Sequence, residues 1–276
     1  MSEKLGIIGF GNMGRAMAEQ LASHYRIAVF DKDENKTSAQ KGIIVARNLI
    51  NLVEKAEVLI LAVKPQDLDP VLKAIRNYVK DKLIVSIAAG ISTKHLEKML
   101  GEVRVVRAMP NIGVKIAESV TCLSRGSFAS DEDLRLAQEL FYYLGVTRVT
   151  EEKMINAATA ISGSGPAYIF YFLEQNYLDP NNIPEHARRD MIKRLAQAAE
   201  NLGFNHEDAM FLAVNTVNTS LSLLKKTKSA PAELRTQVTS KGGTTEAALA
   251  VLRKSDSWDD AARAALKRAE DLARRD

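Results

Sequence analysis

The sequence has one cysteine, four histidines and no long hydrophobic run. The single Cys122 excludes an internal disulfide framework and fits a reducing compartment. No apolar run approaches the roughly 18 residues that a membrane-spanning helix needs. The first residues, "MSEKLGIIGF", have no basic segment ahead of a hydrophobic one, so they do not read as a signal peptide. We therefore expect a cytoplasmic protein without a membrane segment.

The sequence also lacks the residue patterns typical of metal sites, of acid–base catalysis and of nucleic-acid binding. The histidines are His24, His95, His186 and His206, and none lies in a motif. No zinc spacing, Ser/His/Asp order or pair of catalytic carboxylates is present, so we expect no metal. The net charge is +4, but basic residues alternate with acidic ones and are not interleaved with aromatics. We therefore expect no nucleic-acid partner.

The two halves of the chain carry different hydrophobic patterns. Short apolar runs alternate with helical spacing in the first half; they lie at 4–9, 26–30, 42–45, 58–63, 83–87, 103–106, 120–123 and 146–149. This alternation predicts a mostly parallel sheet covered on both faces. Only helical patterns follow, at 153–175, 184–202, 206–225, 244–253 and 259–274. We expect an α/β domain over residues 1–150 and an all-α domain over residues 151–276.

A glycine motif lies between the first apolar run and the first helix. Its residues are Gly9, Phe10, Gly11, Asn12, Met13 and Gly14. Gly9 permits the tight turn, Gly11 lets the backbone approach a pyrophosphate, and Gly14 lets the helix pack on the strand. The helix N-terminus then offers free N–H groups to the phosphates. The pattern predicts a Rossmann-type doubly wound sheet that binds a dinucleotide, although a plain glycine turn is the alternative.

Asp31 ends the second apolar run, near the spacing expected for the acid that binds the ribose. A carboxylate there accepts hydrogen bonds from ribose hydroxyls and repels a 2′-phosphate, which favours NADH over NADPH. Lys32 would favour NADPH instead, because its ammonium could pair with that 2′-phosphate. Asp31 and Asp33 could also simply cap the next helix.

Small residues end the next strands, where the ligand crevice of this architecture lies. Ala62, Val63, Lys64 and Pro65 follow one strand; Ala88, Ala89 and Gly90 follow the next, and Asn111 follows a third. We expect them to form the wall of a nicotinamide site, with Asn111 as a polar contact. Ordinary close packing at residues 88–90 is the alternative.

A second set of glycine motifs lies in the helical half. Residues 162–168 read "SGSGPAY" and residues 238–249 read "VTSKGGTTEAAL". Together with "IIGFGNMG", "LAVKP" and "RAMPN", in the same order, they give a chain that resembles pyrroline-5-carboxylate reductase, the enzyme of the last step of proline biosynthesis. The resemblance spans residues 5 to about 250.

The resemblance implies an N-terminal dinucleotide-binding domain and a C-terminal helical domain that interlocks into a homodimer, which can assemble further into rings. It implies hydride transfer from NADPH or NADH to the C=N carbon of pyrroline-5-carboxylate, a small-molecule substrate, giving L-proline. By the family pattern, Thr245 places its hydroxyl near the ring nitrogen, which makes it the candidate catalytic residue.

The physical chemistry of the second loop agrees with this resemblance, since the N-terminus of a helix suits a small carboxylate. The candidate substrate-binding residues are Ser240, Gly242, Gly243, Thr244 and Thr245. We expect the two glycines to leave backbone N–H groups open. The alternative is a helix cap by one of the threonines. Because a protonated imine is already activated, we hypothesise catalysis by positioning, without a dedicated general base.

The chain departs from the family pattern in three places. Lys241 replaces the usual Pro before the glycine pair, and Ile112-Gly113 replaces the usual Thr-Pro after Asn111. These changes bear on substrate specificity and on the nicotinamide contacts. The stretch 174–195 resembles an insertion, either a surface elaboration or a changed dimer interface.

The sequence is also compatible with two other functions. One is a β-hydroxyacid-type dehydrogenase, in which a catalytic Lys is followed a turn later by Asn; Lys153 and Asn156 are only three residues apart and precede the glycine interruption. The other is a catalytically silent NAD(P)-binding protein of the same fold.

Overall fold

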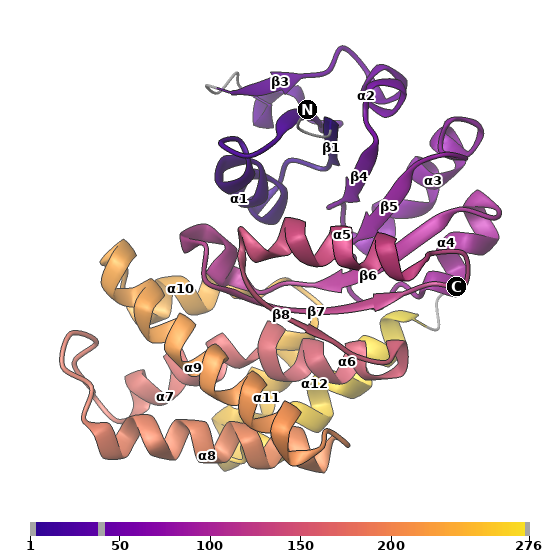
Figure 1. Cartoon of the computed structure of the whole chain (residues 1–276). Helices are drawn as coiled ribbons and strands as arrows, with labels where there is room; N and C mark the ends of the chain where they lie inside the picture. The colour runs from indigo at the N-terminus through magenta and orange to yellow at the C-terminus, as the bar shows by residue number, and fades with distance from the viewer. Residues whose placement is uncertain (1–3, 38–41, 274–276) are drawn as a thin grey trace.

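The computed structural model describes residues 4–37 and 42–273. Within them one sheet of eight strands runs through the upper part of the molecule in Figure 1. The strands are β1 (Lys4–Ile8), β2 (Arg26–Phe30), β3 (Ile43–Val45), β4 (Val58–Leu61), β5 (Leu83–Ser86), β6 (Arg104–Met109), β7 (Ser119–Arg125) and β8 (Gly145–Val149). Their order in the sheet is β3-β2-β1-β4-β5-β6-β7-β8.

The strand order reverses at β1, which pairs in parallel with β2 on one side and with β4 on the other. β4 reads "VLIL" and is buried along its whole length, as expected for a central parallel strand. In open sheets of this kind the crevice beyond the carboxyl ends of the two central strands is the ligand site. The topology therefore places the site just after Ile8 and Leu61.

Helices cover both faces of the sheet. The apolar sides of α1 (Asn12–Leu21) and α5 (Asp131–Tyr142) cover one face, with α1 against β1 and β2 and α5 against β6, β7 and β8. The other face carries α2 (Leu49–Lys55), α3 (Leu68–Ile75) and α4 (Thr93–Leu100), whose apolar residues share one buried cluster with Leu59 and Leu61. The expected doubly wound arrangement is confirmed.

The last two strands add a detail that the apolar runs did not specify. β7 pairs antiparallel with β6, whereas β8 pairs parallel with β7 after the α5 crossover. β7 is also longer than the run at 120–123, since it begins at Ser119 and ends at Arg125. Conversely, β4 ends at Leu61 rather than at Val63, because the chain turns at Ala62 into the crevice.

Over the described residues 152–273 the second half consists of helices joined by turns, and no strand is present there. It contains α6 (Ile155–Ala158), a π-helix (Thr159–Gly163), α7 (Gly165–Gln175), α8 (Glu185–Asn201), α9 (His206–Thr227), α10 (Pro231–Val238), α11 (Thr244–Ser255) and α12 (Trp258–Ala273). The predicted end of the last helix, at residue 274, lies outside the described residues. The sequence reading missed α10, because Pro231 reads as a break yet occupies the first turn, where its missing N–H costs nothing.

One core joins the helices to the sheet. Tyr168 and Trp258 pack edge to face at its centre, with ring centroids 5.9 Å apart. The same cluster contains Met109 of β6 and Cys122 of β7, so the outer strands of the sheet pack directly on the helical half. Figure 1 shows the helices gathered beneath these strands, with the end of α12 reaching up beside the sheet. Elements from both halves therefore meet at the strand ends.

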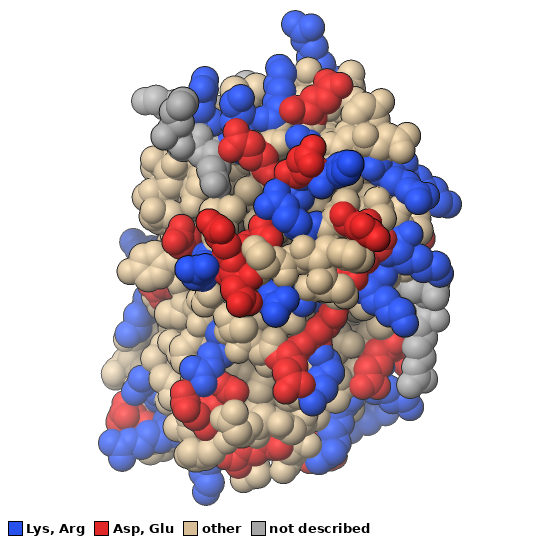
Figure 2. All heavy atoms as spheres, turned by 45° about the vertical axis from the view of Figure 1, so that its right-hand side comes forward, with Lys and Arg blue, Asp and Glu red and all other residues tan. Residues whose placement is uncertain are grey.

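Acidic and basic side chains intermingle over the face shown in Figure 2, and no basic stripe stands out there. Among the helices of the described residues, none combines the length and apolar character needed to cross a bilayer.

Candidate active site

The first glycine loop follows β1 and has the shape that its glycines predict. Gly9 has φ +100°, and a Cβ there would lie 2.7 Å from the carbonyl carbon of Ala62 at the end of β4. A Cβ on Gly14 would collide with the carbonyl oxygen of Gly9. Gly11, the N-cap of α1, faces open space instead. Two glycines therefore serve the fold, and Gly11 leaves room for a ligand.

The other residues of this loop are divided between core and surface. Phe10 is buried, and the Arg15 guanidinium lies 5.2 Å from the centre of its ring. Asn12 is exposed and Met13 is half-buried in the first turn of α1. Of the six motif residues, Gly9 and Gly11 line the cavity described below.

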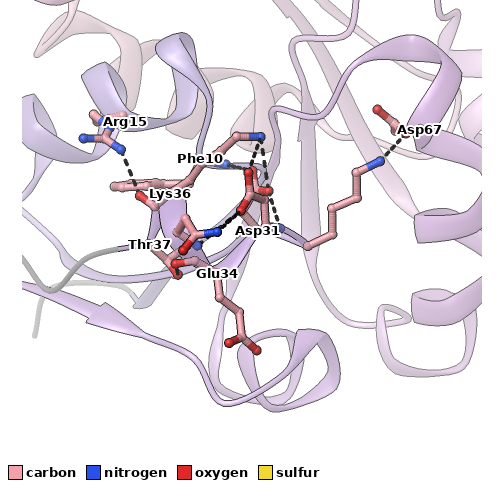
Figure 3. Close-up of polar contacts among 10 residues, drawn as sticks. Phe10, Arg15, Asp31, Glu34, Lys36, Thr37 and Asp67 are labelled. Atoms are coloured by element: carbon pink, nitrogen blue, oxygen red, sulfur yellow. Dashed lines mark hydrogen bonds and ion pairs between the residues drawn. The ribbon is translucent and has the colours of Figure 1, made fainter.

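Asp31 turns its carboxylate back onto the glycine loop, as Figure 3 shows. Its Oδ2 accepts a hydrogen bond of 2.7 Å from the Phe10 N–H, and its Oδ1 accepts one of 2.9 Å from the Asp33 N–H. Asp33 caps the short 3-10 turn 34–36 by accepting from the Asn35 N–H. The capping alternative thus holds for Asp33, whereas Asp31 joins the end of β2 to the nucleotide loop.

Two lysines flank the Asp31 carboxylate and both are paired. Lys36 Nζ lies 3.7 Å from Asp31 Oδ1 and 3.6 Å from Asp33 Oδ2. Lys32 reaches the other way and bonds Asp67 at 2.6 Å, which raises the pKa of the Lys32 ammonium. The negative charge at the end of β2 is therefore partly balanced by Lys36.

These residues border a cavity of about 540 Å³ at the carboxyl ends of β1, β2 and β4. Its lining comes from β1 through α3 and includes Gly9, Gly11, Asp31, Lys32, Lys36, Ala62, Val63 and Lys64. Pro65 does not line it but begins the 3-10 turn 65–67 beside it. This cavity suits a dinucleotide. The N-terminus of α1 and the open space at Gly11 suit its phosphates, and the carboxylate at the end of β2 suits its ribose.

The ends of β5 and β6 form a second part of the site, next to the helices. Ala88 is buried among the sheet residues, whereas Ala89 packs against the helical core. Gly90 has φ +79°, and a Cβ there would lie 3.1 Å from Leu272 Cβ of α12. Residues 88–90 are therefore closely packed and also lie at the edge of the crevice, so the two interpretations of this segment are compatible.

Asn111 is 2% exposed, and its side-chain amide nitrogen donates to no group of the protein among the described residues. Its Oδ1 accepts from the N–H groups of Gly113 and Val120, at 3.0 and 3.3 Å. An orphaned buried amide donor is rare and costly. This donor fits a carbonyl group of a ligand bound at the end of β6, such as the carboxamide of a nicotinamide.

The Ile112-Gly113 departure has a packing reason. A Cβ on Gly113 would collide with Thr219 Cγ2 of α9, and the Thr219 hydroxyl donates to the Glu118 carbonyl at 2.6 Å. The small residue therefore allows α9 to approach the end of β6, and Asn111 keeps its place as the cap of the following turn.

The second glycine loop differs from expectation in one respect. The two glycine N–H groups are not open: that of Gly243 donates to the Ser240 carbonyl at 2.9 Å, and that of Gly242 donates to Glu246 Oε2 at 2.7 Å. Gly242 has φ +69°, and Gly243 is the N-cap of α11. The tight turn uses its own amides, so the free donors at this helix end are those of the first turn, after Gly243.

Side chains hold this loop against the "SGSGPAY" segment. Ser164 is fully buried, and its Oγ lies 3.0 Å from the Thr244 hydroxyl. The Thr245 hydroxyl, on a residue that is 5% exposed, donates to the same Ser164 Oγ at 3.1 Å. Ser240 and Lys241 are exposed at the rim. The two distinctive segments of the helical half thus meet through three hydroxyl groups.

Two contributors could not be read from the sequence. Arg268 of α12 donates from Nε to the Gly242 carbonyl at 2.6 Å, although it lies 26 residues away in an ordinary helical pattern. Glu246 offered a weak signal, since an acid in the first turn of a helix commonly caps free N–H groups. Arg268 gave no comparable signal.

The residue pair of the rival dehydrogenase does not converge. Lys153 is exposed and pairs with Glu151 at 2.7 Å. The Asn156 Oδ1 instead accepts from the buried Arg107 at 2.7 Å. The two side chains therefore serve different contacts and do not form a catalytic pair.

Comparison with known proteins agrees with the geometry. Residues 152–177 and 190–273 match the family model for pyrroline-5-carboxylate reductase dimerisation. Residues 4–90 match the model for coenzyme F420-dependent NADP oxidoreductases. The chain is 34% identical to the pyrroline-5-carboxylate reductase of Aquifex aeolicus over 251 residues, which cover 89% of this chain and 87% of that protein.

The chain belongs to the pyrroline-5-carboxylate reductase family. Solved structures of the family share its fold. The Coxiella burnetii reductase has a TM-score of 0.65 at 29% identity, with 99% of each chain covered. The Plasmodium falciparum reductase, solved with NADP bound, has a TM-score of 0.65 at 25% identity, with 98% of each chain covered.

Membership of the pyrroline-5-carboxylate reductase family confirms the resemblance drawn from the five motifs and the assignment as an oxidoreductase that uses a nicotinamide cofactor. The dimerisation model leaves residues 178–189 unmatched, within the stretch that the sequence marked as an insertion. In the structure this segment is a turn, closed by a 2.9 Å bond from the Asn181 N–H to Asp179, followed by the start of α8.

Proposed function

We propose that this chain reduces L-1-pyrroline-5-carboxylate to L-proline with a hydride from NAD(P)H, the last step of proline biosynthesis. The observation that carries the proposal is the bonding of Thr244 and Thr245 to Ser164, which closes the family's two distinctive segments into one site at the start of α11. A catalytically silent dinucleotide-binding protein would not need the hydroxyl groups of Ser164, Thr244 and Thr245 to be joined in this way.

We infer that the substrate carboxylate binds at the N-terminus of α11. The turn from Ser240 to Gly243 fixes its direction, and the N–H groups of Thr244 and Thr245 lack intrahelical partners. A helix N-terminus favours an anion by its partial positive charge. Lys241, exposed at the rim, adds attraction for the same charge.

The reduction then needs little proton chemistry. A bound nicotinamide would supply a hydride to the C=N carbon. If the imine is protonated, its π electrons become the nitrogen lone pair and the nitrogen keeps its proton, so the ring amine forms without a general base. Thr245 holds the ring nitrogen, and the wall at Ala88, Ala89 and Asn111 orients the cofactor.

For the cofactor, we infer a preference for NADH over NADPH, based on Asp31. Backbone N–H groups of Phe10 and Asp33 hold this carboxylate at the ribose position. Lys36 already pairs with Asp31 and Asp33, and Lys32 pairs with Asp67. A 2′-phosphate would meet a fixed negative charge and would have to separate existing ion pairs.

The Asp31→Ser variant tests this preference. We expect wild-type kcat/KM to be higher with NADH, and the ratio to shift toward NADPH by about tenfold or more in the variant, since close charge repulsion costs at least about 1.4 kcal/mol. Asp67→Asn, which frees Lys32 without changing the Asp31 carboxylate, is the matched comparison. A wild-type preference for NADPH would refute the role given to Asp31.

We further propose the division into a dinucleotide-binding domain of residues 1–150 and a helical domain of residues 151–276. The change from strands to helices after Val149 supports it. The match of the helical half to the dimerisation model supports a homodimer. We propose rings of dimers as a higher assembly. The single buried Cys122 is in keeping with a cytoplasmic location.

The function is tested by turnover of the purified protein with pyrroline-5-carboxylate and each reduced cofactor, followed by NAD(P)H consumption and by identification of L-proline. We expect turnover with the imine and none with 2- or 3-hydroxy acids in the reverse direction. Cofactor binding without any imine turnover would identify a silent binding protein instead.

A further inference from the structure

Thr245 belongs to a group of hydroxyl side chains at the edge of the helical core. Its Oγ1 donates to Ser164 Oγ at 3.1 Å, and Ser164 Oγ also lies 3.0 Å from the Thr244 hydroxyl. One helical turn after Ser164, the Tyr168 hydroxyl donates to the Ala160 carbonyl at 2.9 Å. The Thr245, Ser164 and Tyr168 side chains are at least nine-tenths buried. Each hydroxyl therefore has its partner within the protein.

The π-helix before Ser164 frees the carbonyl that Tyr168 uses. In an α-helix the Ser164 N–H would bond to the Ala160 carbonyl, four residues back. Here it bonds to the Thr159 carbonyl, five residues back, at 2.8 Å. This leaves the Ala160 carbonyl to the Tyr168 hydroxyl, which holds the turn that carries Ser164. Such π-turns are rare and are frequently found at functional sites.

The hydroxyl of Thr245 donates its one proton to Ser164 Oγ, so this proton points into the core. Ser164 also bonds the Thr244 hydroxyl, and either direction of that bond leaves the Thr245 proton on Ser164. The lone pairs of the Thr245 oxygen therefore remain for a ligand.

We propose that Ser164 is a positioning residue that holds Thr245 as a hydrogen-bond acceptor, and that Tyr168 holds the turn that carries Ser164, so that the site selects the protonated form of a cyclic imine. This inference rests on the proposed function, because it takes Thr245 as the residue beside the ring nitrogen. An iminium N–H can donate to Thr245 Oγ1, whereas the lone pair of a neutral imine would face another lone pair.

The charged groups near Thr245 on its own loop, on α7 and on α12 are either exposed or paired. Lys241 and Glu246 flank Thr245 on its own loop and helix, and both are exposed. Arg268 of α12 is committed to the Gly242 carbonyl, and Glu174 of α7 is paired with Arg235. The pH dependence of kcat/KM should therefore report the protonation of the substrate nitrogen rather than that of a neighbouring side chain.

The test compares Ser164→Ala with Ser162→Ala. Ser162 belongs to the same segment and is equally buried, but its hydroxyl bonds only to the Ala158 carbonyl. In Ser164→Ala, Thr245 loses its acceptor and can turn its proton toward the substrate. We expect kcat to fall about 10-fold to 100-fold with KM changed by less than about threefold, because orientation is lost and the carboxylate contacts remain. Ser162→Ala should stay within about threefold of wild type in both constants.

The pH profile gives a readout that a merely structural role would not move. In the wild type, kcat/KM should fall above the pKa of the substrate imine. In Ser164→Ala this fall should become shallower, since Thr245 can then donate to the neutral imine. Tyr168→Phe should shift the profile in the same direction by a smaller amount.

The outcomes separate the two proposals. If the wild type does not reduce the imine at all, the proposed function fails, and this inference fails with it. If the wild type is active but Ser164→Ala matches Ser162→Ala in kcat and in pH profile, only the positioning role is overturned. Melting temperatures of the variants show whether either one loses its fold.

Discussion

The carboxylate of Glu246 accepts a 2.7 Å hydrogen bond from the N–H of Gly242, at the loop that we assign to the substrate. A protein carboxylate thus already lies at a site suited to a substrate carboxylate. Arg268 holds the other side of the same residue through its carbonyl. The loop is therefore set in shape before any ligand arrives, but it carries a competing negative charge.

Replacement of Glu246 by Gln should lower KM for pyrroline-5-carboxylate by about threefold to tenfold, because removal of a nearby like charge favours anion binding. The effect should shrink as salt is added, since exposed charges are screened. Glu233→Gln in the first turn of α10 is the control, because it makes the same charge change away from the loop. An unchanged KM would show that Glu246 does not compete with the substrate.

The glycines of the nucleotide loop should separate into two classes. Gly14→Ala places a Cβ against the Gly9 carbonyl and should lower both the melting temperature and cofactor affinity. Gly11→Ala meets open space in the protein and should leave the melting temperature within about 1 °C, while weakening cofactor binding about tenfold or more, because the pyrophosphate must approach this backbone. Calorimetric titration with NADH checks both. Equal cofactor affinity of Gly11→Ala and wild type would show that the pyrophosphate does not bind beside Gly11.

The sequence predicted the parts of the fold that depend on local pattern. The "VLIL" run and the glycine motif impose a strand and a turn through properties of a few neighbouring residues. The antiparallel β7 could not be foreseen, because an apolar run does not specify the direction of its partner. α10 was missed because Pro231 is as compatible with a break as with a first helical turn.

The site was predictable to a similar extent. Glycines and small residues at strand ends mark where a ligand fits, and the structure gathers Gly9, Gly11, Asp31 and Ala62 around one cavity. Contacts between distant residues, such as Arg268 with Gly242, depend on how helices pack. The occupied N–H groups of Gly242 and Gly243 were misjudged, since a bare sequence does not show that a turn uses its own amides.

Glu152 connects the sheet to the helical half, and its charge should matter for stability. It accepts from both the N–H and the hydroxyl of Thr93 at the start of α4. It also lies 3.7 Å from the guanidinium of Arg107, whose pKa burial lowers to about 10 despite the opposing effect of Glu152. Loss of this carboxylate leaves Arg107 as a buried charge without a compensating anion.

We therefore expect Glu152→Gln to lower the free energy of unfolding by about 2 kcal/mol. Glu151→Gln, one residue away in an exposed pair with Lys153, should change it by less than about 0.5 kcal/mol. Urea titration followed by circular dichroism gives both values. Equal stabilities of the two variants would mean that Glu152 does not balance the Arg107 charge.

Cys122 should be unreactive in the folded protein, which makes the single thiol a reporter of unfolding. It lies on β7 at 1% exposure, and burial raises its pKa to about 12, with Asp208 acting in the same direction and Arg148 against it. Because the thiolate is the nucleophile, its population at pH 8 should be about a thousandfold below that of a free thiol.

We expect a disulfide reagent to label native protein only at the rate of unfolding, and to label one thiol at once in denaturant. The raised pKa also fixes the sign of a pH effect. The thiol's contribution to stability is fully present below about pH 9 and is lost as the pH rises toward about 12, since the unfolded chain ionises first. Cys122→Ala should remove both the labelling and this part of the alkaline loss. Rapid labelling of native wild type, at a rate independent of added denaturant, would contradict the burial of Cys122 between β7 and the helical half.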